Sequence, residues 1–326
     1  MPFTIVRNDI VNMRTDVIVN TASPCPVIGG GTDAAIHKAA GPQLLAARKK
    51  IGGIAPGKAC ITPGFDLPAK YVIHTVSPVW QGGSHGEQRT LQMCYQHALE
   101  LAEKYGCKSI AFPLISAGTY GFPGALALQT AMQVCSGFLM EHEMQIFLVV
   151  FSKEAYELSG KLQQSVESYI DDNYVQEQTG TEYCMRCSRR ASAFPEMPEV
   201  CSAEADLDDL LKHRDAGFAE TLVMLIEHSG KKNSEIYKKA NVDKKLFSKI
   251  INNVNYHPSK ATAVAFSIAL ELNLEQTRDL VSRAGYSMTH SSKFDIIIEY
   301  FILHHNYDIF EINETLFQFD QPLLGC

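Results

Sequence analysis

The stretch VIVNTASPCPVIGGGTDAAIHKAAG, residues 17–41, decides the fold of the first half of the chain. It opens with an apolar, β-branched run at residues 17–19, which is typical of a buried strand. Asn20 follows where that strand should end, and a loop with two prolines and three consecutive glycines leads into a segment, residues 33–40, that favours a helix. Consecutive glycines let the backbone approach a ligand with its N–H groups, and a helix that starts next to them adds the positive end of its dipole. The stretch therefore predicts a loop that holds an anion such as phosphate.

A second strand, glycine loop and helix of the same kind follows later. Residues 109–114 (SIAFPL) predict a buried strand that runs into the loop ISAGTYGFP at 115–123, and Pro123 suits the first turn of a helix over 124–141. Strands expected at 3–6, 17–20, 58–62, 71–76, 109–114 and 146–151 alternate with helices expected at 33–51, 87–105, 124–141 and 153–170. This alternation predicts a three-layer α/β/α fold with a mainly parallel sheet. Both glycine loops would lie at the carboxyl ends of strands and face one crevice.

These stretches resemble the ADP-ribose-binding macrodomain, in particular its MacroD-type branch. That branch typically shows VNAAN, a glycine-rich loop and VDGAIHRAAG, and the matching residues here are VNTAS at 19–23, GGG at 29–31 and TDAAIHKAAG at 32–41. The loop ISAGTYGFP is similar to the family's ISTGIYGYP. The chain departs from the pattern at Ser23, where the family has a second asparagine.

The resemblance implies that ADP-ribose is the ligand and that no metal or cofactor is needed. Asp9 would accept a hydrogen bond from the adenine amino group, Phe151 would stack on adenine, and Phe122 would border the distal ribose. For Asp9 the alternative is an Asx turn, and for the two phenylalanines it is core packing. A Rossmann fold that binds NAD is a weaker alternative, because the first loop lacks G-x-G-x-x-G. The expected ligand-binding residues are Asp9, Ile10, Asn20, Ser23, Gly29, Gly30, Gly31, Ser116, Ala117, Gly118, Thr119, Tyr120, Gly121, Phe122 and Phe151.

The expected catalytic residues are Asp33, His37 and Asn20. Asp33 and His37 are four residues apart, so they share one face of the expected helix. The resemblance implies hydrolysis at the distal ribose, which would release ADP-ribose from Asp or Glu side chains of a protein or acetate from O-acetyl-ADP-ribose. Asp33 would position or activate the attacking water, His37 would tune Asp33 or the water network, and Asn20 would hold the ribose hydroxyls. The alternative is that Asp33 only caps the helix and that His37 is an ordinary surface histidine.

Ser23 suggests a second hypothesis, in which the protein is a binding protein rather than an enzyme. Serine offers one short hydroxyl where the family's asparagine offers a two-headed amide. Binding could survive while turnover falls, so the chain could be a non-catalytic ADP-ribose sensor that acts through its C-terminal half.

The sequence changes character after the first domain, which is expected at residues 1–172. Residues 173–213 form a polar, acidic segment that predicts a linker. It contains the pair Cys184 and Cys187, which could form a zinc clip with Cys201 and His213, although the separations match no standard zinc module. Residues 214–326 predict a helical bundle with helices at 216–228, 234–239, 244–252, 260–271, 275–283, 292–304 and 308–317, and with Asn233, Asp243 and Asn273 as N-caps.

The run SEIYKKANVDKKLFSKIINN, residues 234–253, resembles the lambda-repressor-like helix-turn-helix domain. Residues 231–249 hold seven lysines against Glu235 and Asp243, a local excess that could neutralise DNA phosphates. The expected recognition helix has no arginine and few base-reading groups beyond Asn252 and Asn253. A DNA or protein partner through residues 231–253, or a homodimer, therefore stays open. The tail at residues 295–319 is rich in Ile, Phe and Tyr, which fits a packed core or a dimer interface.

Composition sets the outer limits. The chain has 326 residues, is 46% hydrophobic and carries a net charge of −7, which argues against a protein that coats nucleic acid or anionic membrane with its whole surface. No apolar run approaches the roughly 20 residues that span a bilayer. Nine scattered cysteines without a signal peptide predict free thiols in the cytoplasm.

Overall fold

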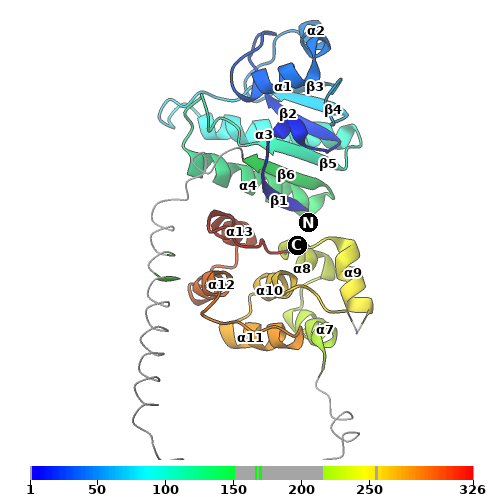
Figure 1. Ribbon diagram of the computed structural model, residues 1–326, viewed down its shortest axis with the longest axis vertical. Coiled ribbons are helices and arrows are strands. Elements are labelled where there is room, and N and C mark those ends of the chain that lie inside the picture. The colour runs from blue at the N-terminus through cyan, green and yellow to red at the C-terminus, as the bar shows by residue number, and fades with distance from the viewer. Residues whose placement is uncertain (1, 151–165, 167–168, 171–215, 254–255, 326) are drawn as a thin grey trace, which may run out of the picture. The chain divides into compact units, whose positions relative to one another are not determined.

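The computed structural model describes residues 2–150, 166, 169–170, 216–253 and 256–325. The chain divides into two units, Met1–Lys161 with Asn241–Asp243 and Asn313–Gln318, and Leu162–Ala240 with Lys244–Ile312 and Phe319–Cys326. In Figure 1 the α/β part is coloured blue to green and the helical part yellow to red. The expected linker and the expected domain boundaries at 172 and 213 fall outside the described residues, as do Phe151 and the candidate zinc ligands Cys184, Cys187, Cys201 and His213.

The first unit is built on a sheet that is parallel except at one edge. Its described strands lie in the order β1-β6-β5-β2-β4-β3, and β3 is antiparallel to β4 while every other neighbouring pair is parallel. The prediction of a mainly parallel, three-layer α/β fold is confirmed. The strands are β1 (Phe3–Arg7), β2 (Val17–Thr21), β3 (Ala59–Pro63), β4 (Tyr71–Thr75), β5 (Ser109–Pro113) and β6 (Gln145–Val150).

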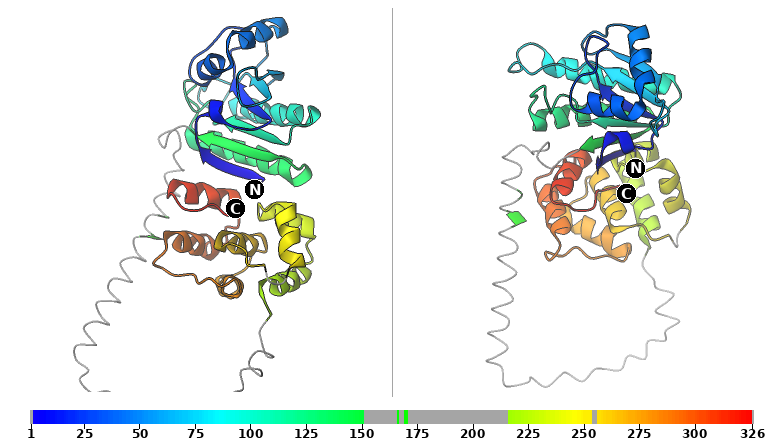
Figure 2. Two further views of the ribbon diagram at one scale, coloured as in Figure 1. Left: turned by 45° about the vertical axis from the view of Figure 1, so that its right-hand side comes forward. Right: turned by 45° about the horizontal axis from the view of Figure 1, so that its top comes forward.

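Helices cover both faces of this sheet (Figure 2). They are the 3₁₀ turn η1 (Ile10–Asn12), α1 (Thr32–Ala40), α2 (Pro42–Ile51), α3 (Glu87–Lys104) and α4 (Gly124–Glu141). Right-handed crossovers place α1 and α2 on one face and α3 and α4 on the other. The buried side chains agree: Ile18 of β2 belongs to one core cluster with Ile36 of α1, whereas Phe112 of β5 packs on Tyr95 of α3, with 5.1 Å between the ring centroids.

One expected helix is in fact two. The single helix expected over residues 33–51 breaks at Gly41, which has φ 79° and separates α1 from α2. A Cβ at this position would lie 2.8 Å from a carboxylate oxygen of Asp66, so both the dihedral angle and the close approach require glycine. Pro42 then occupies the first turn of α2.

The described residues from 216 onward are helical, as expected. Asn273 is confirmed as an N-cap, because its side chain accepts a hydrogen bond from the Gln276 amide at 2.9 Å. Asn233 is wrong as an N-cap: it lies inside α8, and Lys232 precedes it without a capping side-chain bond. The helices are α7 (Phe218–Ser229), α8 (Asn233–Lys239), α9 (Lys244–Asn252), α10 (Lys260–Ala269), α11 (Leu274–Arg283), α12 (Lys293–Leu303) and α13 (Ile309–Gln318).

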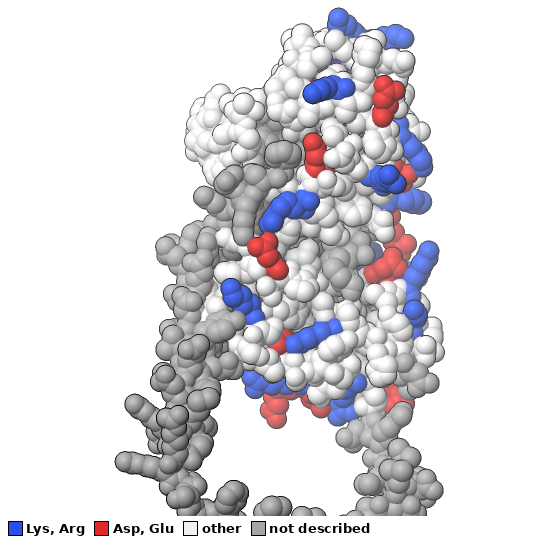
Figure 3. Space-filling model, in the orientation of Figure 1, with Lys and Arg blue, Asp and Glu red and all other residues white. Residues whose placement is uncertain are grey.

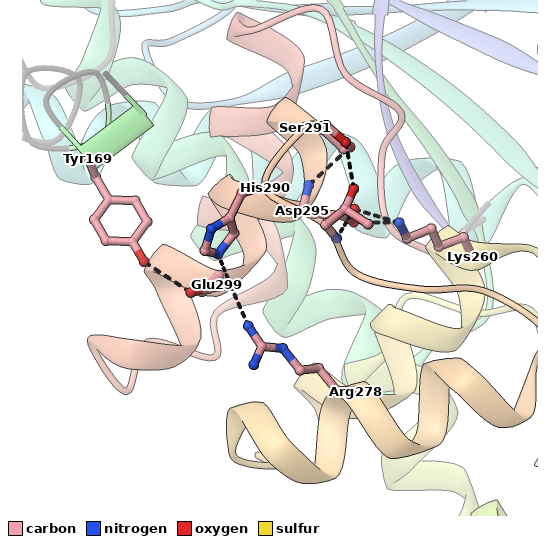
Figure 4. A network of polar contacts seen from close by, with 9 residues as sticks. Tyr169, Lys260, Arg278, His290, Ser291, Asp295 and Glu299 are labelled. Atoms are coloured by element: carbon pink, nitrogen blue, oxygen red, sulfur yellow. Dashed lines mark hydrogen bonds and ion pairs between the residues drawn. The ribbon is translucent and has the colours of Figure 1, made fainter. Parts of the chain in front are cut away.

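Two carboxylates on α12 hold this helix in its unit (Figure 4). Asp295, 1% exposed, pairs with Lys260 of α10 at 2.6 Å. Glu299 accepts from Arg278 of α11 at 3.2 Å, from His290 at 3.0 Å and from the Tyr169 hydroxyl at 3.4 Å. Residues 294–302 are all buried within the described structure, which favours a packed core over a dimer interface for this part of the tail.

Two expectations from composition can be compared with the described residues. Cys25, Cys60, Cys94, Cys107 and Cys135 are free thiols. Among the described helices, none combines the length and the apolar character needed to cross a membrane.

Candidate active site

Strand alternation brings two polar side chains to one face of the sheet. Ile18 of β2 and Val72 of β4 pair in register and are buried on the face that α1 covers. Two residues further along each strand, Asn20 and His74 therefore point to the same face, and they too are register partners. Both are fully buried. They lie at the carboxyl ends of neighbouring parallel strands, where open α/β sheets bind ligands.

Asp33 joins them from α1. It is 2% exposed, and its Oδ1 lies 2.5 Å from Nδ2 of Asn20. Its Oδ2 accepts a hydrogen bond from the backbone amide of Gly29 at 2.6 Å. The carboxylate therefore fixes the start of the glycine loop to the first turn of the helix, and both of its oxygens have donors, as a buried anion requires.

His37 lies one turn further along α1 and is also buried. Its Nε2 is 3.5 Å from Oδ1 of Asp33. Burial lowers the pKa of His37 below its usual value, the nearby Arg48 guanidinium lowers it further, and the Asp33 carboxylate acts in the opposite direction. Among the described residues, His37 Nδ1 and Asn20 Oδ1 are buried without a hydrogen-bond partner. Buried polar atoms are rarely left unpaired, so these two mark a place that a ligand can complete.

Behind Asn20, two further side chains extend the polar chain into the sheet. Asn20 Nδ2 is 3.1 Å from His74 Nδ1, and His74 Nε2 is 2.9 Å from the Thr62 hydroxyl on β3. Burial lowers the pKa of His74 to about 3, and the charges of Arg48 and His37 act in the same direction. His74 is therefore a neutral imidazole at physiological pH.

We expect this histidine to make the first unit acid-sensitive. The folded chain binds a proton at His74 only near pH 3, whereas the unfolded chain binds it near its ordinary pKa of 6.5. The stabilisation is therefore complete above pH 6.5 and is lost as the pH falls toward 3, by roughly 5 kcal/mol at about 1.4 kcal/mol per pH unit. The lowered pKa of His37 adds to the same trend.

Denaturant unfolding followed across this pH range measures the effect. The control is His74→Asn, which cannot titrate at this position and should show a flatter dependence of unfolding free energy on pH. Parallel profiles for the two proteins would contradict the prediction.

Two glycine-rich loops present backbone amides beside these side chains. In the first, the amides of Gly30, Gly31 and Thr32 lie at the N-terminus of α1. In the second, hydrogen bonds from Gly121 N to Gly118 O (2.9 Å) and from Phe122 N to Ser116 O (3.1 Å) close the loop. The amides of residues 117–120 donate no hydrogen bond within the described part of the chain. A Cβ placed on Gly31 would lie 3.9 Å from the Thr119 hydroxyl, so the loops are neighbours.

A third loop, residues 77–86, braces the second glycine loop. Ser116, at φ 66°, donates from its hydroxyl to Pro78 O at 3.0 Å, and Trp80 N donates to Tyr120 O at 3.0 Å. The Trp80 ring packs edge-to-face on Phe122, 4.6 Å between centroids. Phe122 is only 2% exposed, so in this structure it is covered by Trp80. The Glu87 carboxylate, at the start of α3, holds the loop by accepting from the amides of Gln81, Gly83 and His85.

The remaining residues that were expected to bind the ligand differ in their burial and in their contacts. One Asp9 oxygen accepts from the Val11 amide at 3.1 Å, so the Asx turn considered as its alternative is present. Ile10 is a core residue, 5% exposed. Ser23 is partly exposed, and its carbonyl accepts from the buried Arg48 at 3.2 Å. Phe151 lies outside the described residues.

The sequence analysis missed several residues that shape this site. These residues reach the site through contacts between segments that are distant in sequence. For His74 the sequence held one signal: it lies two residues after Val72 in an expected strand, as Asn20 lies two residues after Ile18. No cluster of three or more potential metal ligands occurs in the part of the chain that the structure describes. The missed residues are Arg48, Thr62, His74, Trp80 and Glu87.

Comparison with known proteins relates part of this chain to one family. Residues 19–131 match the model of the Macro domain family. A "Macro domain-containing protein" of Methanosarcina mazei is 50% identical over 153 residues, which cover 46% of this chain and 82% of that protein. A protein of Enterobacter sp. named O-acetyl-ADP-ribose deacetylase is 48% identical over 164 residues, 48% of this chain and 91% of its own length. Among solved structures, an Oceanobacillus iheyensis macrodomain mutant with ADPR is 38% identical in sequence. The match covers 47% of this chain and 87% of the Oceanobacillus chain, with a TM-score of 0.46.

The fold and the site define a three-layer α/β protein with paired amide-lined loops at the strand ends. The chain belongs to the Macro domain family. The two relatives match less than half of its length, and residues 19–131, which match the family model, lie in the first unit.

Proposed function

We propose that the first unit binds ADP-ribose and hydrolyses its esters, either O-acetyl-ADP-ribose or mono-ADP-ribosylated Asp and Glu side chains. The observation that carries the proposal is the position of Asp33. This buried carboxylate accepts hydrogen bonds from Asn20 and from the Gly29 amide, next to two loops whose amides at residues 30–32 and 117–120 donate no hydrogen bond among the described residues. The family relatives named O-acetyl-ADP-ribose deacetylase support the same reaction class.

Each part of the site has a role in this reaction. The amides of residues 30–32 and 117–120 hold the diphosphate, because backbone N–H groups at a helix N-terminus and in a glycine loop favour an anion. The unpartnered Asn20 Oδ1 and His37 Nδ1 can take hydrogen bonds with the hydroxyls of the distal ribose. Asp33 then accepts a proton from the water whose oxygen bonds to the carbonyl carbon of the ester. The bond between that carbon and the ribose oxygen breaks, the ribose oxygen takes the proton from Asp33, and the acyl group leaves as a carboxylic acid.

Substrate assays test this proposal. The protein is incubated separately with O-acetyl-ADP-ribose and with a peptide carrying ADP-ribose on a glutamate, and free ADP-ribose is followed by chromatography. We expect time-dependent release from at least one of them. Binding of ADP-ribose without release from either substrate would favour the sensor hypothesis, in which Ser23 permits binding but not turnover.

A second candidate function rests on α9 in the helical unit. The turn between α8 and α9 contains Asn241 at φ 53°, a left-handed conformation that asparagine tolerates. One exposed face of α9 carries only basic and neutral polar groups, Lys244, Lys245, Ser248, Lys249 and Asn252. We propose that this face contacts a nucleic-acid backbone.

The positive charge of the exposed α9 face does not extend to the lysines on its neighbouring segments that are paired with Glu271. Lys231 and Lys239 lie 3.0 and 3.5 Å from Glu271, so the charges of these two lysines are already paired. On the face of the molecule drawn in Figure 3, basic and acidic side chains are interspersed in both units. Over the face drawn there, no broad basic surface competes with α9 for a polyanion.

Replacement of Lys244 and Lys245 by alanine tests this second function. If the protein binds duplex DNA, the double variant should bind more weakly, and the slope of log K against log salt should fall by about 2, close to one for each phosphate contact. The control is Lys293→Ala, an exposed lysine on α12. Absence of any salt-dependent shift of duplex DNA by the unmodified protein at low salt would remove this function.

A further inference from the structure

The orientation of the Asn20 side chain is set by two acceptors. Its Nδ2 lies 2.5 Å from Asp33 Oδ1 and 3.1 Å from His74 Nδ1, so each of the two amide protons has a partner. The reverse orientation would place the amide oxygen against the Asp33 carboxylate, with no proton between the two oxygens. Asn20 Oδ1 is then left as the amide atom without a partner among the described residues.

This arrangement determines which nitrogen of His74 carries the proton. Because Asn20 donates to Nδ1, that nitrogen must keep its lone pair, and the single proton of the neutral ring lies on Nε2. Nε2 donates to the Thr62 hydroxyl at 2.9 Å, and the hydroxyl proton turns toward Val72 O at 3.5 Å. The hydrogen bonds thus run outward from the Asn20 amide: one goes directly to Asp33, and the other leads through His74 and Thr62 to Val72 O.

The surroundings of His74 keep the imidazole neutral. From α1, Asp33 and His37 face it, with 6.4 Å between the two imidazole centroids. From α2, Arg48 is 2% exposed and, among the described residues, has no carboxylate within 4 Å; its guanidinium binds the carbonyls of Gly52 and Ser23 instead. From β3, Cys60 is the register partner of His74. A protonated His74 would turn an N–H group toward the N–H group of Asn20 and break the chain.

We propose that His74 is a positioning residue for ester hydrolysis: its unprotonated Nδ1 holds the Asn20 amide, and Asn20 in turn orients the Asp33 carboxylate. The inference rests on the proposed function for its kinetic consequence, but its structural part does not need a substrate. His74 reaches Asp33 through Asn20, since Asn20 Nδ2 bonds both.

Two substitutions of His74 distinguish the hydrogen-bond acceptor at Nδ1 from the rest of the imidazole ring. In His74→Leu the acceptor for Asn20 is lost, whereas in His74→Asn the side-chain oxygen stands close to the place of Nδ1. Thr62→Val is the matched control, because it breaks the far end of the chain and leaves Nδ1 in place. The kcat for O-acetyl-ADP-ribose and the Kd for ADP-ribose are measured for all three.

We expect His74→Leu to lower kcat by about 10²-fold, the size of effect that a small misplacement of a catalytic group produces, with a much smaller change in Kd. His74→Asn should recover most of kcat, and Thr62→Val should stay within a few-fold of the unmodified protein while unfolding more easily. A His74→Leu protein that retains kcat, or a His74→Asn protein as slow as His74→Leu, would overturn the proposal.

Nuclear magnetic resonance of the unmodified, ligand-free protein covers the case in which a variant fails to fold. A two-bond ¹H–¹⁵N correlation spectrum should show His74 with an unprotonated Nδ1 and a protonated Nε2 at neutral pH. A protonated Nδ1 overturns the proposal whether or not the protein is an enzyme. If the tautomer is as expected but no ester is hydrolysed, the proposed function fails instead. The side-chain amide resonances of Asn20 then decide the positioning role: a large shift in His74→Leu that is absent in His74→Asn supports it, and unshifted resonances in both reject it.

Discussion

Replacing Asp33 by asparagine is expected to lower the hydrolysis of ADP-ribosyl esters by about 10²- to 10⁴-fold, the usual contribution of a positioned general base. Asparagine has nearly the same volume, and its amide oxygen can still accept from the Gly29 amide, which Asp33 Oδ2 does at 2.6 Å. The glycine loop should therefore keep its conformation. The new amide nitrogen faces Asn20 Nδ2, from which Asp33 Oδ1 accepts, so ADP-ribose should still bind but less tightly. The measurement is kcat for O-acetyl-ADP-ribose together with Kd for ADP-ribose.

Two controls make this result specific. Asp33→Ala removes the acceptor for Gly29 as well, so it should weaken ADP-ribose binding in addition to turnover. Asp66→Asn makes the same chemical change at an exposed aspartate near Gly41 and should leave kcat unchanged. Turnover in Asp33→Asn within a few-fold of the unmodified protein would show that this carboxylate is not the base.

The second large effect concerns folding. Gly64 lies in the turn that leads from β3 to β4, and its amide donates to Lys70 O at 2.8 Å. A Cβ at this position would lie 1.9 Å from the backbone oxygen of Ala69, far inside van der Waals contact and against backbone rather than a flexible side chain. Gly64→Ala must therefore displace the turn, and we expect it to lower the free energy of unfolding by about 3 kcal/mol or more. Because β4 carries His74, the site should lose its geometry as well.

Gly137→Ala provides the matched control. Gly137 lies on the exposed side of α4, where an added Cβ would meet nothing within 4 Å. Alanine in a helix interior is more stable than glycine by about 0.5–1 kcal/mol, so this variant should unfold at the same or a higher denaturant concentration. If the free energy of unfolding of Gly64→Ala lies within about 1 kcal/mol of that of the unmodified protein, the turn can accommodate the added methyl group and the prediction is wrong.

The fold was predictable because its signals are local. The strands, the two glycine loops and the alternation with helices follow from residues that are close in sequence, and the strands differ from the prediction by one residue at their ends. The break at Gly41 was missed, although glycine followed by proline is a readable helix stop. Asn233 was misplaced as a cap because helix α8 begins one residue earlier than its periodicity suggested.

The site was predictable only where one motif contains its residues. Asn20, Asp33 and His37 lie within one stretch, and the structure brings them together. His74 and Thr62 join them through the order β5-β2-β4-β3, which depends on how distant strands pair. Arg48 and Trp80 likewise act across loops that no local pattern connects. Their roles follow from tertiary packing, which a single sequence does not display.

The central claim is that the two amide-lined loops and the Asp33 helix form an ADP-ribose site. Calorimetric titration of the full chain with ADP-ribose tests it most directly. We predict saturable binding of one ligand per chain, weakened in a variant that strains the first loop, Gly31→Val, because Gly31 has φ 57°. No heat of binding up to millimolar ADP-ribose would contradict the account.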